Sequence, residues 1–333
     1  MEKIDVVVSW VDGSDPKHAA KRRKFQKKST VKLHPNGTRK TRFAHCGEIY
    51  YCIASILKYA DFVNKIWIVT DNQQPEFLNA FSDAGLCSAD FIEVVDHKTV
   101  FEGLENVLPT FSARGIEAVV WRIPKLAEQF IYLNDDFFLN QPMTPEFLFQ
   151  GGRPVLRGKM IRSNTWLQDS VLGSLVQKLT PRMQNSRPSF RIAQELGAKR
   201  TGNAGKFFMV GHHPHPMRKS VLTQYYQANH EVLVEQTSYR FRSIKQFTPA
   251  SLANHLEINR HGAKIKRPAS EAYIRPRREF MTKRAMKKVR DGSANYGCIQ
   301  NLDVFPPETL TEFRKILGEK FKGFLPAAIT FSD

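Results

Sequence analysis

The chain has 333 residues, of which 41% are hydrophobic and 25% charged, with a formal net charge of +18, a balance that excludes a disordered protein. No apolar run approaches the 18 residues of a membrane-spanning helix, and the start, MEKIDVVVSW, is too short an apolar run for a signal peptide. The four cysteines lack metal-ligand or disulfide-framework spacing, so we expect a reduced, cytoplasmic protein.

The first 150 residues alternate between strand and helix signals. The first strand is Ile4–Trp10, and Asp15 followed by Pro16 is typical of a helix N-cap with proline at the first helical position. The next elements are a helix in GEIYYCIASILKYA, a strand at Lys65–Asp71, a short helix in QPEFLNAF, a strand in FIEVVD, a helix in SARGIEAVVWRI and a strand at Phe130–Asn134. Short apolar strands separated by helices predict a mostly parallel sheet with helices on both faces.

Beyond about residue 150 the composition changes. Helical and loop segments dominate, basic residues occur throughout, and we expect helices at 249–260 and 309–325. No internal repeat, phosphate-binding glycine loop, or serine or cysteine nucleophile motif is found.

Polar clusters directly follow four of the predicted strands. They are Trp10–Asp15, Asp71–Gln74, Asp96–His97 and Asn134–Asp136. Because open parallel sheets bind ligands at the carboxyl ends of their strands, these clusters predict one site along one edge, with Asp71 and Gln73 among its substrate-binding candidates. The alternative is a local role, with Asp15 as a helix cap and Asp71 and Asp96 as turn formers.

The stretch FIYLNDDFFLN places Asn134, Asp135 and Asp136 between two apolar runs. Their oxygens suit Mg²⁺, with Mn²⁺ as the alternative, because Mg²⁺ binds through one or two carboxylates together with water and substrate phosphates. Two adjacent carboxylates repel each other, so either a cation is present or one pKa is raised. The pair therefore predicts a metal clamp on a phosphate or a general base.

A histidine cluster and an arginine pair occur in the second half. His212, His213 and His215 have no further Cys or His at zinc spacing, so we predict acid–base work or phosphate contact for at least one of them. Arg240 and Arg242, two apart in TSYRFRS, suit bidentate phosphate binding, and ordinary surface charge is the alternative.

Two basic blocks flank an acidic body. Residues 17–42 hold eleven Lys and Arg and no acid, and residues 264–290 hold eleven against two acids, whereas residues 43–150 have a net charge of −9. Such blocks suit anionic lipid, a polyanionic substrate or nucleic acid, and the alternative is a solvated surface. No nucleic-acid-binding module is recognisable, so we do not expect a nucleic acid partner.

Several segments resemble the Stealth family of sugar-1-phosphate transferases. DVVVSWVDGSDP resembles its first conserved region, and GEIYYCIASILKYADFVNKIWIVTDNQQPEFL with LPTFSARGIEAVVWRIPKLAEQFIYLNDDFFLNQP resembles the second. HHPHPMRKSVL with TSYRFRS resembles the third, and GCIQNLDVFPPETLTEFRKIL more loosely the fourth. The resemblance implies a glycosyltransferase-A-like αβα core that binds a nucleotide sugar over residues 1–150. It also implies that the helical, basic residues 151–333 complete the same catalytic unit.

The resemblance also implies site residues. It assigns Asp5, Trp10 and Asp12 to the nucleotide-sugar segment, Asp135 and Asp136 to the acidic pair, His212 and His215 to the histidine motif, and Arg242 to the family's arginine. The chain departs from the family at three places, which are Ala44 with His45, Ala54, and Gln300 with Asn301. The last departure argues against metal binding by the fourth region.

We therefore expect a hexose-1-phosphate transferase of bacterial surface polysaccharide synthesis. It would move sugar-1-phosphate from a nucleotide-diphosphate sugar to a hydroxyl of a glycan or lipid-linked glycan and release a nucleoside monophosphate. The runner-up is a metal-dependent glycosyltransferase that releases the diphosphate, and a nucleic-acid-binding protein is the third alternative. The basic blocks would hold the protein at the inner face of the plasma membrane.

Overall fold

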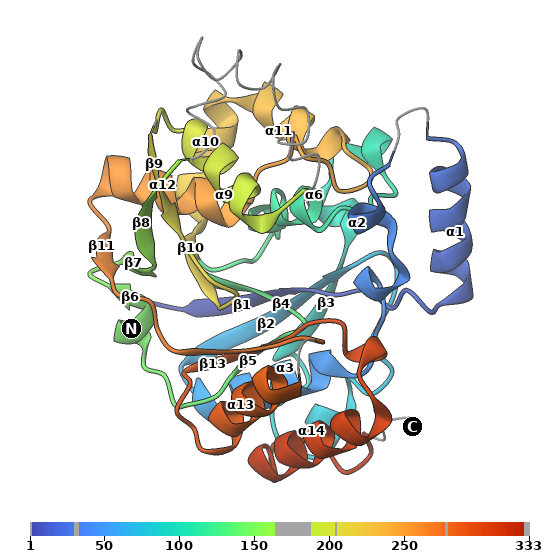
Figure 1. The fold of residues 1–333 in the computed structure, drawn as a ribbon. Helices are drawn as coiled ribbons and strands as arrows, with labels where there is room; N and C mark the ends of the chain where they lie inside the picture. The colour runs from blue at the N-terminus through green and yellow to red at the C-terminus, as the bar shows by residue number, and fades with distance from the viewer. Residues whose placement is uncertain (1, 30–32, 164–187, 204, 277–278, 330–333) are drawn as a thin grey trace.

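The computed structural model describes residues 2–29, 33–163, 188–203, 205–276 and 279–329. A five-stranded sheet with the strand order β10-β4-β1-β2-β3 runs through the middle of the molecule (Figure 1). Its strands are β1 (Ile4–Ser9), β2 (Val63–Thr70), β3 (Ile92–Asp96), β4 (Gln129–Asn134) and β10 (His215–Arg218). The first four are parallel to their neighbours and β10 is antiparallel to β4, so the mostly parallel sheet is confirmed.

Helices cover both faces of this sheet, which explains the continuous apolar runs in its strands. In β1 the side chains of Val6 and Val8 belong to one core, and Val7 between them belongs to the other. The first core includes α3 (Glu48–Tyr59), α13 (Glu279–Arg290) and α14 (Pro307–Lys320). The second includes α10 (Lys219–Ala228), α11 (His230–Ser238) and α12 (Pro249–His261). A strand covered on both faces needs apolar side chains at successive positions.

The helix signals are confirmed in part. Asp15 caps α1 (Pro16–Lys27) by accepting a hydrogen bond from Lys17 N at 2.9 Å. The helix expected in SARGIEAVVWRI is broken into α6 (Ala113–Glu117) and a 3₁₀ turn at Val120–Arg122, since Gly115 and consecutive β-branched valines weaken helix propensity. The other helices of the described residues are α2 (Pro35–Thr38), α4 (Ala80–Asp83), α5 (His97–Val100), α7 (Pro145–Leu148) and α9 (Phe190–Lys199), with 3₁₀ turns at Lys40–Arg42, Glu105–Val107 and Leu302–Val304.

The chain leaves the central sheet after β4 and enters a second sheet. This sheet has the order β12-β13-β5, with β12 (Glu271–Ile274), β13 (Tyr296–Ile299) and β5 (Phe137–Leu139). Two smaller sheets contain β6 (Phe149–Gln150), β7 (Arg153–Arg157) and β11 (Lys264–Lys266), and β8 (Lys159–Arg162) with β9 (Lys206–Met209). Residues 135–136 therefore form the link between the two larger sheets.

The order of the strands reverses between β1 and β4. From β1 the chain adds β2 and then β3 on one side of the sheet, and β4 on the other side. Ligands of open α/β sheets bind outside the carboxyl ends of the strands at such a reversal. Ser9 and Asn134 are partners in the register, so residues 10 and 135 leave the sheet next to each other.

The second half of the chain contributes to the central sheet through β10 and to the second core through α10, α11 and α12. The division at residue 150 stays a prediction. No helix among the described residues combines the length and the apolar composition that crossing a bilayer requires.

Candidate active site

The loops after β1 and β2 interlock at the carboxyl edge of the sheet. The Gln73 side chain donates to Asp12 O at 2.8 Å and to Asp15 Oδ2 at 3.0 Å, and it accepts from Asp12 N at 3.1 Å. Asn72 N donates to Asp96 Oδ2 at 2.7 Å, and Asp96 also caps α5. The predicted clusters thus lie along one edge, and several of their carboxylates hold the loops in place.

Three further predicted residues lie on this edge. Asp71 forms an ion pair with Lys21 of α1 at 2.8 Å, and Asp12 accepts from Ser14 through Oδ1. The Trp10 indole N–H donates to His45 Nδ1 at 3.2 Å. Burial lowers the pKa of His45, which keeps this ring neutral and its Nδ1 free to accept.

Asp5 lies at the other end of β1. Its carboxylate accepts from Asn64 Nδ2 at 2.7 Å, from Trp67 Nε1 at 2.9 Å and from Ala127 N at 2.9 Å, and the residue is 1% exposed. At about 3.3 Å per residue, five residues of strand place it roughly 16 Å from Trp10. Asp5 is therefore separated from the other candidate residues, and its carboxylate ties β1 to β2 and to the segment before β4.

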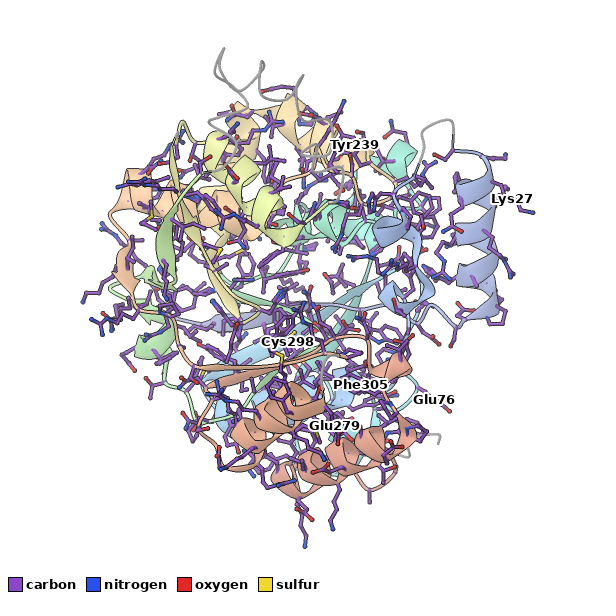
Figure 2. The ribbon with its side chains drawn as sticks, viewed as in Figure 1. Lys27, Glu76, Tyr239, Glu279, Cys298 and Phe305 are labelled. Carbon is purple, nitrogen blue, oxygen red and sulfur yellow. The ribbon has the colours of Figure 1, made fainter. Side chains whose placement is uncertain are left out.

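The acidic pair lies in the turn between β4 and β5. Asp136 O accepts from Ile299 N at 2.8 Å, and the Cys298 thiol, in the interior of the molecule (Figure 2), donates to Asp136 Oδ2 at 3.7 Å. Asp136 Oδ1 is buried and has no hydrogen-bond partner. Asp135 and Asp136 are each half-buried, so part of each residue remains accessible to solvent.

Burial and like charge act together on these carboxyls. Burial raises the pKa of Asp136 to about 7, and it raises the pKa of Asp135 well above its usual value, with the charge of Asp136 adding to the effect. Glu48, the first residue of α3, contributes a third negative charge, and burial raises its own pKa as well. Asn134 Oδ1 accepts from the Tyr132 hydroxyl at 3.2 Å. A positive ligand at this turn would relieve the repulsion.

His212 is the most accessible residue of the histidine motif. Its ring is stacked between Phe190 and Tyr273, with ring centroids 4.7 Å away on each side. Burial, together with the charges of His213, Arg275 and Arg242, lowers the pKa of His212 to about 4. The ring is therefore neutral at pH 7 and able to accept a proton.

The other two histidines are buried. The His213 ring stacks on Tyr296 and its Nδ1 lies 2.8 Å from Pro214 O. His215 is part of β10, opposite Tyr132 of β4, and burial lowers its pKa well below the usual value. His215 is thus a strand residue of the central sheet, 5% exposed, while His212 is half-buried at the site.

Arg240 and Arg242 have different surroundings because the chain bends at residues 240 and 241. The Arg240 guanidinium donates to Asn106 O, Val107 O and Leu108 O at 3.2–3.3 Å, so it is occupied by backbone and is removed from the phosphate-binding candidates.

Arg242 has a buried Nε without a hydrogen-bond partner. Burial lowers the pKa of Arg242, and the charges of Arg42 and Arg114 add to this. A crowded guanidinium of this kind favours an anionic ligand.

The structure adds residues that the sequence reasoning missed. Glu117 of α6 lies close enough to Arg242 to interact electrostatically, and burial raises the pKa of Glu117 to about 7. Arg275 lies 5.1 Å from the Tyr273 ring, and the Tyr273 hydroxyl donates to Gln300 Oε1. Glu48 and Glu117 had a usable signal, namely a single acid within an apolar helix, whereas Arg275 was hidden within a basic block.

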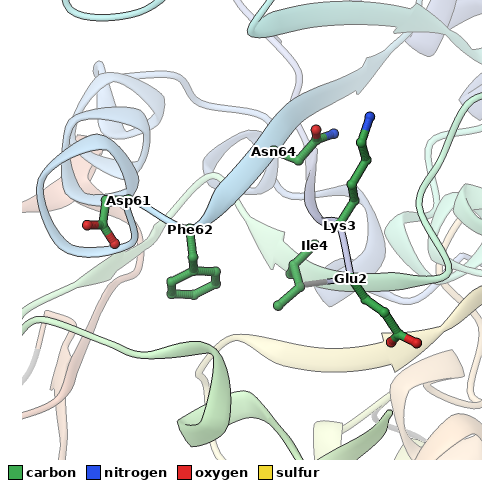
Figure 3. A pocket seen from close by; sticks show the side chains of 6 residues that line it. All are labelled: Glu2, Lys3, Ile4, Asp61, Phe62 and Asn64. Atoms are coloured by element: carbon green, nitrogen blue, oxygen red, sulfur yellow. The ribbon is translucent and has the colours of Figure 1, made fainter.

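A hollow in the surface lies away from this site. It has a volume of about 500 Å³ and lies at the amino ends of β1 and β2, at the opposite edge of the sheet (Figure 3). Its lining residues are Glu2, Lys3, Ile4, Asp61, Phe62 and Asn64. These side chains carry both signs of charge, and they are separated by the length of β1 from the acidic pair. Among the described residues, no group of three or more His, Cys, Asp or Glu side chains is arranged to hold a metal ion unaided.

Two family models match the chain. Stealth protein CR1, conserved region 1, matches residues 2–30, and Stealth protein CR2, conserved region 2, matches residues 42–155. The resemblance to this family is therefore confirmed over these two regions. The resemblance of residues 212–243 and 297–317 to the third and fourth regions stays a prediction.

Several proteins with similar sequences are named polysaccharide phosphotransferases. The capsular polysaccharide phosphotransferase cps1A of Actinobacillus pleuropneumoniae is 38% identical over 147 residues, which cover 44% of this chain and 38% of that protein. A capsular polysaccharide phosphotransferase of Actinobacillus suis is 26% identical over 331 residues, covering 99% of this chain and 76% of that one. The chain spans about two fifths of the length of the first relatives that it matches. Among solved structures, the galactosyltransferase LgtC in complex with donor and acceptor sugar analogs is 12% identical with a TM-score of 0.43, over 96% of this chain and 100% of that chain.

Proposed function

Because this chain is a Stealth protein in its first and second conserved regions, we propose that it transfers sugar-1-phosphate in bacterial surface polysaccharide synthesis. The donor is a nucleotide-diphosphate sugar and the acceptor is a hydroxyl of a glycan or lipid-linked glycan. The observation that supports this proposal is the grouping at the strand reversal. There the carboxylate pair has an unpartnered oxygen, and the charge of Arg42 acts on both Asp136 and Arg242. The neutral His212 ring lies 6.3 Å from the ring of Phe137, the residue after Asp136, and close enough to Arg242 for that charge to affect its pKa.

The acidic pair fits a divalent cation. Asp136 Oδ1 is a buried oxygen without a partner, and the mutual repulsion of the carboxyls is relieved by positive charge. Two carboxylates are also the number that Mg²⁺ or Mn²⁺ takes when water and phosphate oxygens complete its ligands. Asp135 and Asp136 would hold the ion, which when bound would neutralise charge on the donor's diphosphate.

His212 is the general base in this proposal. Its neutral ring accepts the proton of the acceptor hydroxyl while that oxygen forms a bond to the phosphorus next to the sugar. The bond between this phosphorus and the bridging oxygen breaks, and the nucleoside monophosphate leaves with that oxygen. Stacking on Phe190 and Tyr273 fixes the plane of the ring before the acceptor binds.

Arg242 stabilises the transferred group. Phosphoryl transfer spreads negative charge over the equatorial oxygens, and catalysis rests on positioning and on fixed positive charge. The Arg242 guanidinium has an unused buried donor and lies close enough to His212 to affect its pKa. It therefore suits the phosphoryl oxygens, with the base on the acceptor side.

The released nucleotide tests this function. A panel of nucleotide sugars, with and without Mg²⁺, is first screened for thermal stabilisation, since a ligand of the native state raises its melting temperature. The stabilising donor is then incubated with a glycan acceptor. We expect a nucleoside monophosphate, because cleavage falls between the two phosphates. Release of the diphosphate would establish the glycosyltransferase alternative instead.

We further propose that the protein works at the inner face of the plasma membrane. The exposed basic residues of α1 are Lys17, Arg23, Lys24 and Lys27, and those of α13 are Lys283, Arg284, Lys287 and Arg290. Lys27 points away from the body of the protein (Figure 2). At the start of α13, Phe280 is 63% and Met281 39% exposed. Residues 30–32 and 277–278 of the two basic blocks lie outside the described part.

A further inference from the structure

Arg114 joins two segments of the chain that are far apart in sequence. It lies in α6 and is 4% exposed. Its Nη1 donates to Ser243 O at 3.2 Å and Gln246 O at 3.3 Å, and its Nη2 donates to Pro188 O at 3.3 Å and Ser189 O at 2.9 Å. A planar guanidinium has donors in fixed directions, so it can hold two segments at a set spacing.

Each of the two segments carries a residue of the candidate site. Ser243 directly follows Arg242, and Ser189 directly precedes Phe190, whose ring stacks on His212. The Nη1 end of the Arg114 guanidinium therefore holds the residue that follows the proposed phosphate-binding arginine in the sequence. The Nη2 end holds the residue that precedes Phe190, whose ring orients the proposed base.

A buried network of hydrogen bonds through Gln236 and Gln246 holds the segment that follows Arg242. Gln246 Oε1 accepts from Ser112 Oγ at 2.8 Å and from Ser243 N at 3.0 Å. Gln236 Nε2 donates to Arg114 O at 3.2 Å and to Phe247 O at 2.8 Å. Buried polar networks with satisfied partners restrict local motion, so Arg114 acts from a rigid base formed by α6 and α11.

We propose that Arg114 is a positioning residue that sets the spacing between Arg242 and His212 without touching the substrate. This inference rests on the proposed function for the roles of those two residues. Burial lowers the pKa of Arg114 to about 10, so the group stays charged at neutral pH and keeps all its donors. Lysine cannot replace it, because one ammonium group cannot span both segments.

The test compares Arg114→Met and Arg114→Lys with a matched control, Arg122→Met. Arg122 also donates to two backbone carbonyls, Val100 O at 2.9 Å and Glu102 O at 2.6 Å, but neither carbonyl adjoins Arg242 or a ring that stacks on His212. We expect both Arg114 variants to lower kcat at least tenfold, with donor KM within threefold. Arg122→Met should keep its kcat within threefold, although its melting temperature falls.

Hydrogen exchange gives a second readout that needs no substrate. In both Arg114 variants, amides of residues 188–196 and 240–250 should exchange at least tenfold faster together, while those of β1 and β4 stay protected. Faster exchange in only one segment, or a kcat equal to that of Arg122→Met, would overturn the positioning role. If the wild type shows the coupled protection but no sugar-1-phosphate transfer, the proposed function fails, and the catalytic part of this inference fails with it.

Discussion

At the scale of single residues, the candidate site depends on groups whose charge states are set by burial. The pKa of Asp136 is raised to about 7 and that of His212 lowered to about 4, so the usual order of a carboxyl and an imidazole is reversed. Near neutral pH the acid holds a proton about half of the time, and the imidazole holds none. Asp136 can therefore lose its proton easily to bind a cation, and His212 is already in the neutral form that can accept a proton from an acceptor hydroxyl.

Asp136→Asn should stabilise the metal-free protein more at pH 8 than at pH 5.5. A carboxyl whose folded-state pKa is raised contributes stability that is present at low pH and lost as the pH rises through about 7. Urea unfolding at both values measures this difference. Mg²⁺ at pH 8 should raise the melting temperature of the wild type only. Equal effects of the substitution at both pH values would show that Asp136 is not perturbed.

His212→Phe should lower turnover by roughly 10²-fold or more, since it removes the proposed general base. The new ring keeps the stack between Phe190 and Tyr273, so the melting temperature should change little. His212→Ala is the matched variant, and it should lose both turnover and stability. A phenylalanine variant with wild-type turnover would leave the base to Asp135 or Asp136.

At the scale of elements, α1 connects the edge of the sheet to the segment that carries Arg242. The Arg22 guanidinium lies 4.2 Å from the centre of the Phe43 ring, and Phe25 packs against Phe111. Phe111 in turn stacks on Phe241 with ring centroids 5.0 Å apart. Changes in the docking of α1 therefore reach the residue next to Arg242.

Asp15→Ala should destabilise α1 by about 1 kcal/mol, the usual effect of removing an N-cap side chain. The change also removes the acceptor of Gln73, whose other contacts hold Asp12. Hydrogen exchange should show faster exchange over residues 16–27, and Asp15→Asn, which keeps an acceptor oxygen, should restore most of the protection. Unchanged exchange over α1 would mean that aromatic packing alone holds the helix.

The sequence predicted those elements whose signal is local. The four parallel strands follow from short apolar runs, and the Asp15 cap follows from the Asp15–Pro16 dipeptide. The position of Asp135 and Asp136 at the carboxyl edge of the sheet follows from the strand that precedes them. The strand β10 was missed because HPMR has no strand signal of its own and is paired by β4, more than 80 residues earlier in the chain. Arg240 and Arg242 looked equivalent because the bend between them is set by tertiary contacts.

At the scale of the whole molecule, the buried ionisable groups act on stability in opposite directions. Burial lowers the pKa of seven of the ten histidines, namely His18, His45, His97, His212, His213, His215 and His255. Their contribution is present above about pH 6.5 and is lost as the pH falls, because the unfolded state then binds the extra protons. Burial raises the pKa of five carboxyls, those of Glu48, Glu117, Asp135, Asp136 and Asp303, whose contribution is lost as the pH rises.

We therefore expect the free energy of unfolding to be largest near pH 6.5. Below this value the histidines outnumber the carboxyls, and above it Asp136 and Glu117 ionise near pH 7. Urea midpoints measured from pH 4.5 to 8.5 in the absence of divalent ions test this expectation. A steady rise to pH 8.5 would contradict the raised pKa values of the carboxyls.

Binding to anionic vesicles should depend on α13. Each Lys or Arg near an anionic surface contributes about 1 kcal/mol, an effect that salt screens. Replacing Lys283, Arg284 and Lys287 with Gln should lower binding to phosphatidylserine vesicles at least tenfold in a flotation assay. The control replaces the exposed Lys125, Lys245 and Lys322, which lie on other elements. Equal losses in the two triple variants would indicate a general effect of net charge.

The position of the acidic pair has a consequence for the order of events during synthesis. The strand that leads into it, β4, ends at residue 134, but the strand that pairs with the residues after it, β13, begins at residue 296. While a ribosome is still adding the residues between them, β1 to β4 can pair, and Asp136 lacks both Ile299 and Cys298 as partners. The nascent chain therefore has the edge proposed to bind the donor long before its acidic turn is fixed, and we expect it to stay inactive until residues near 300 have emerged.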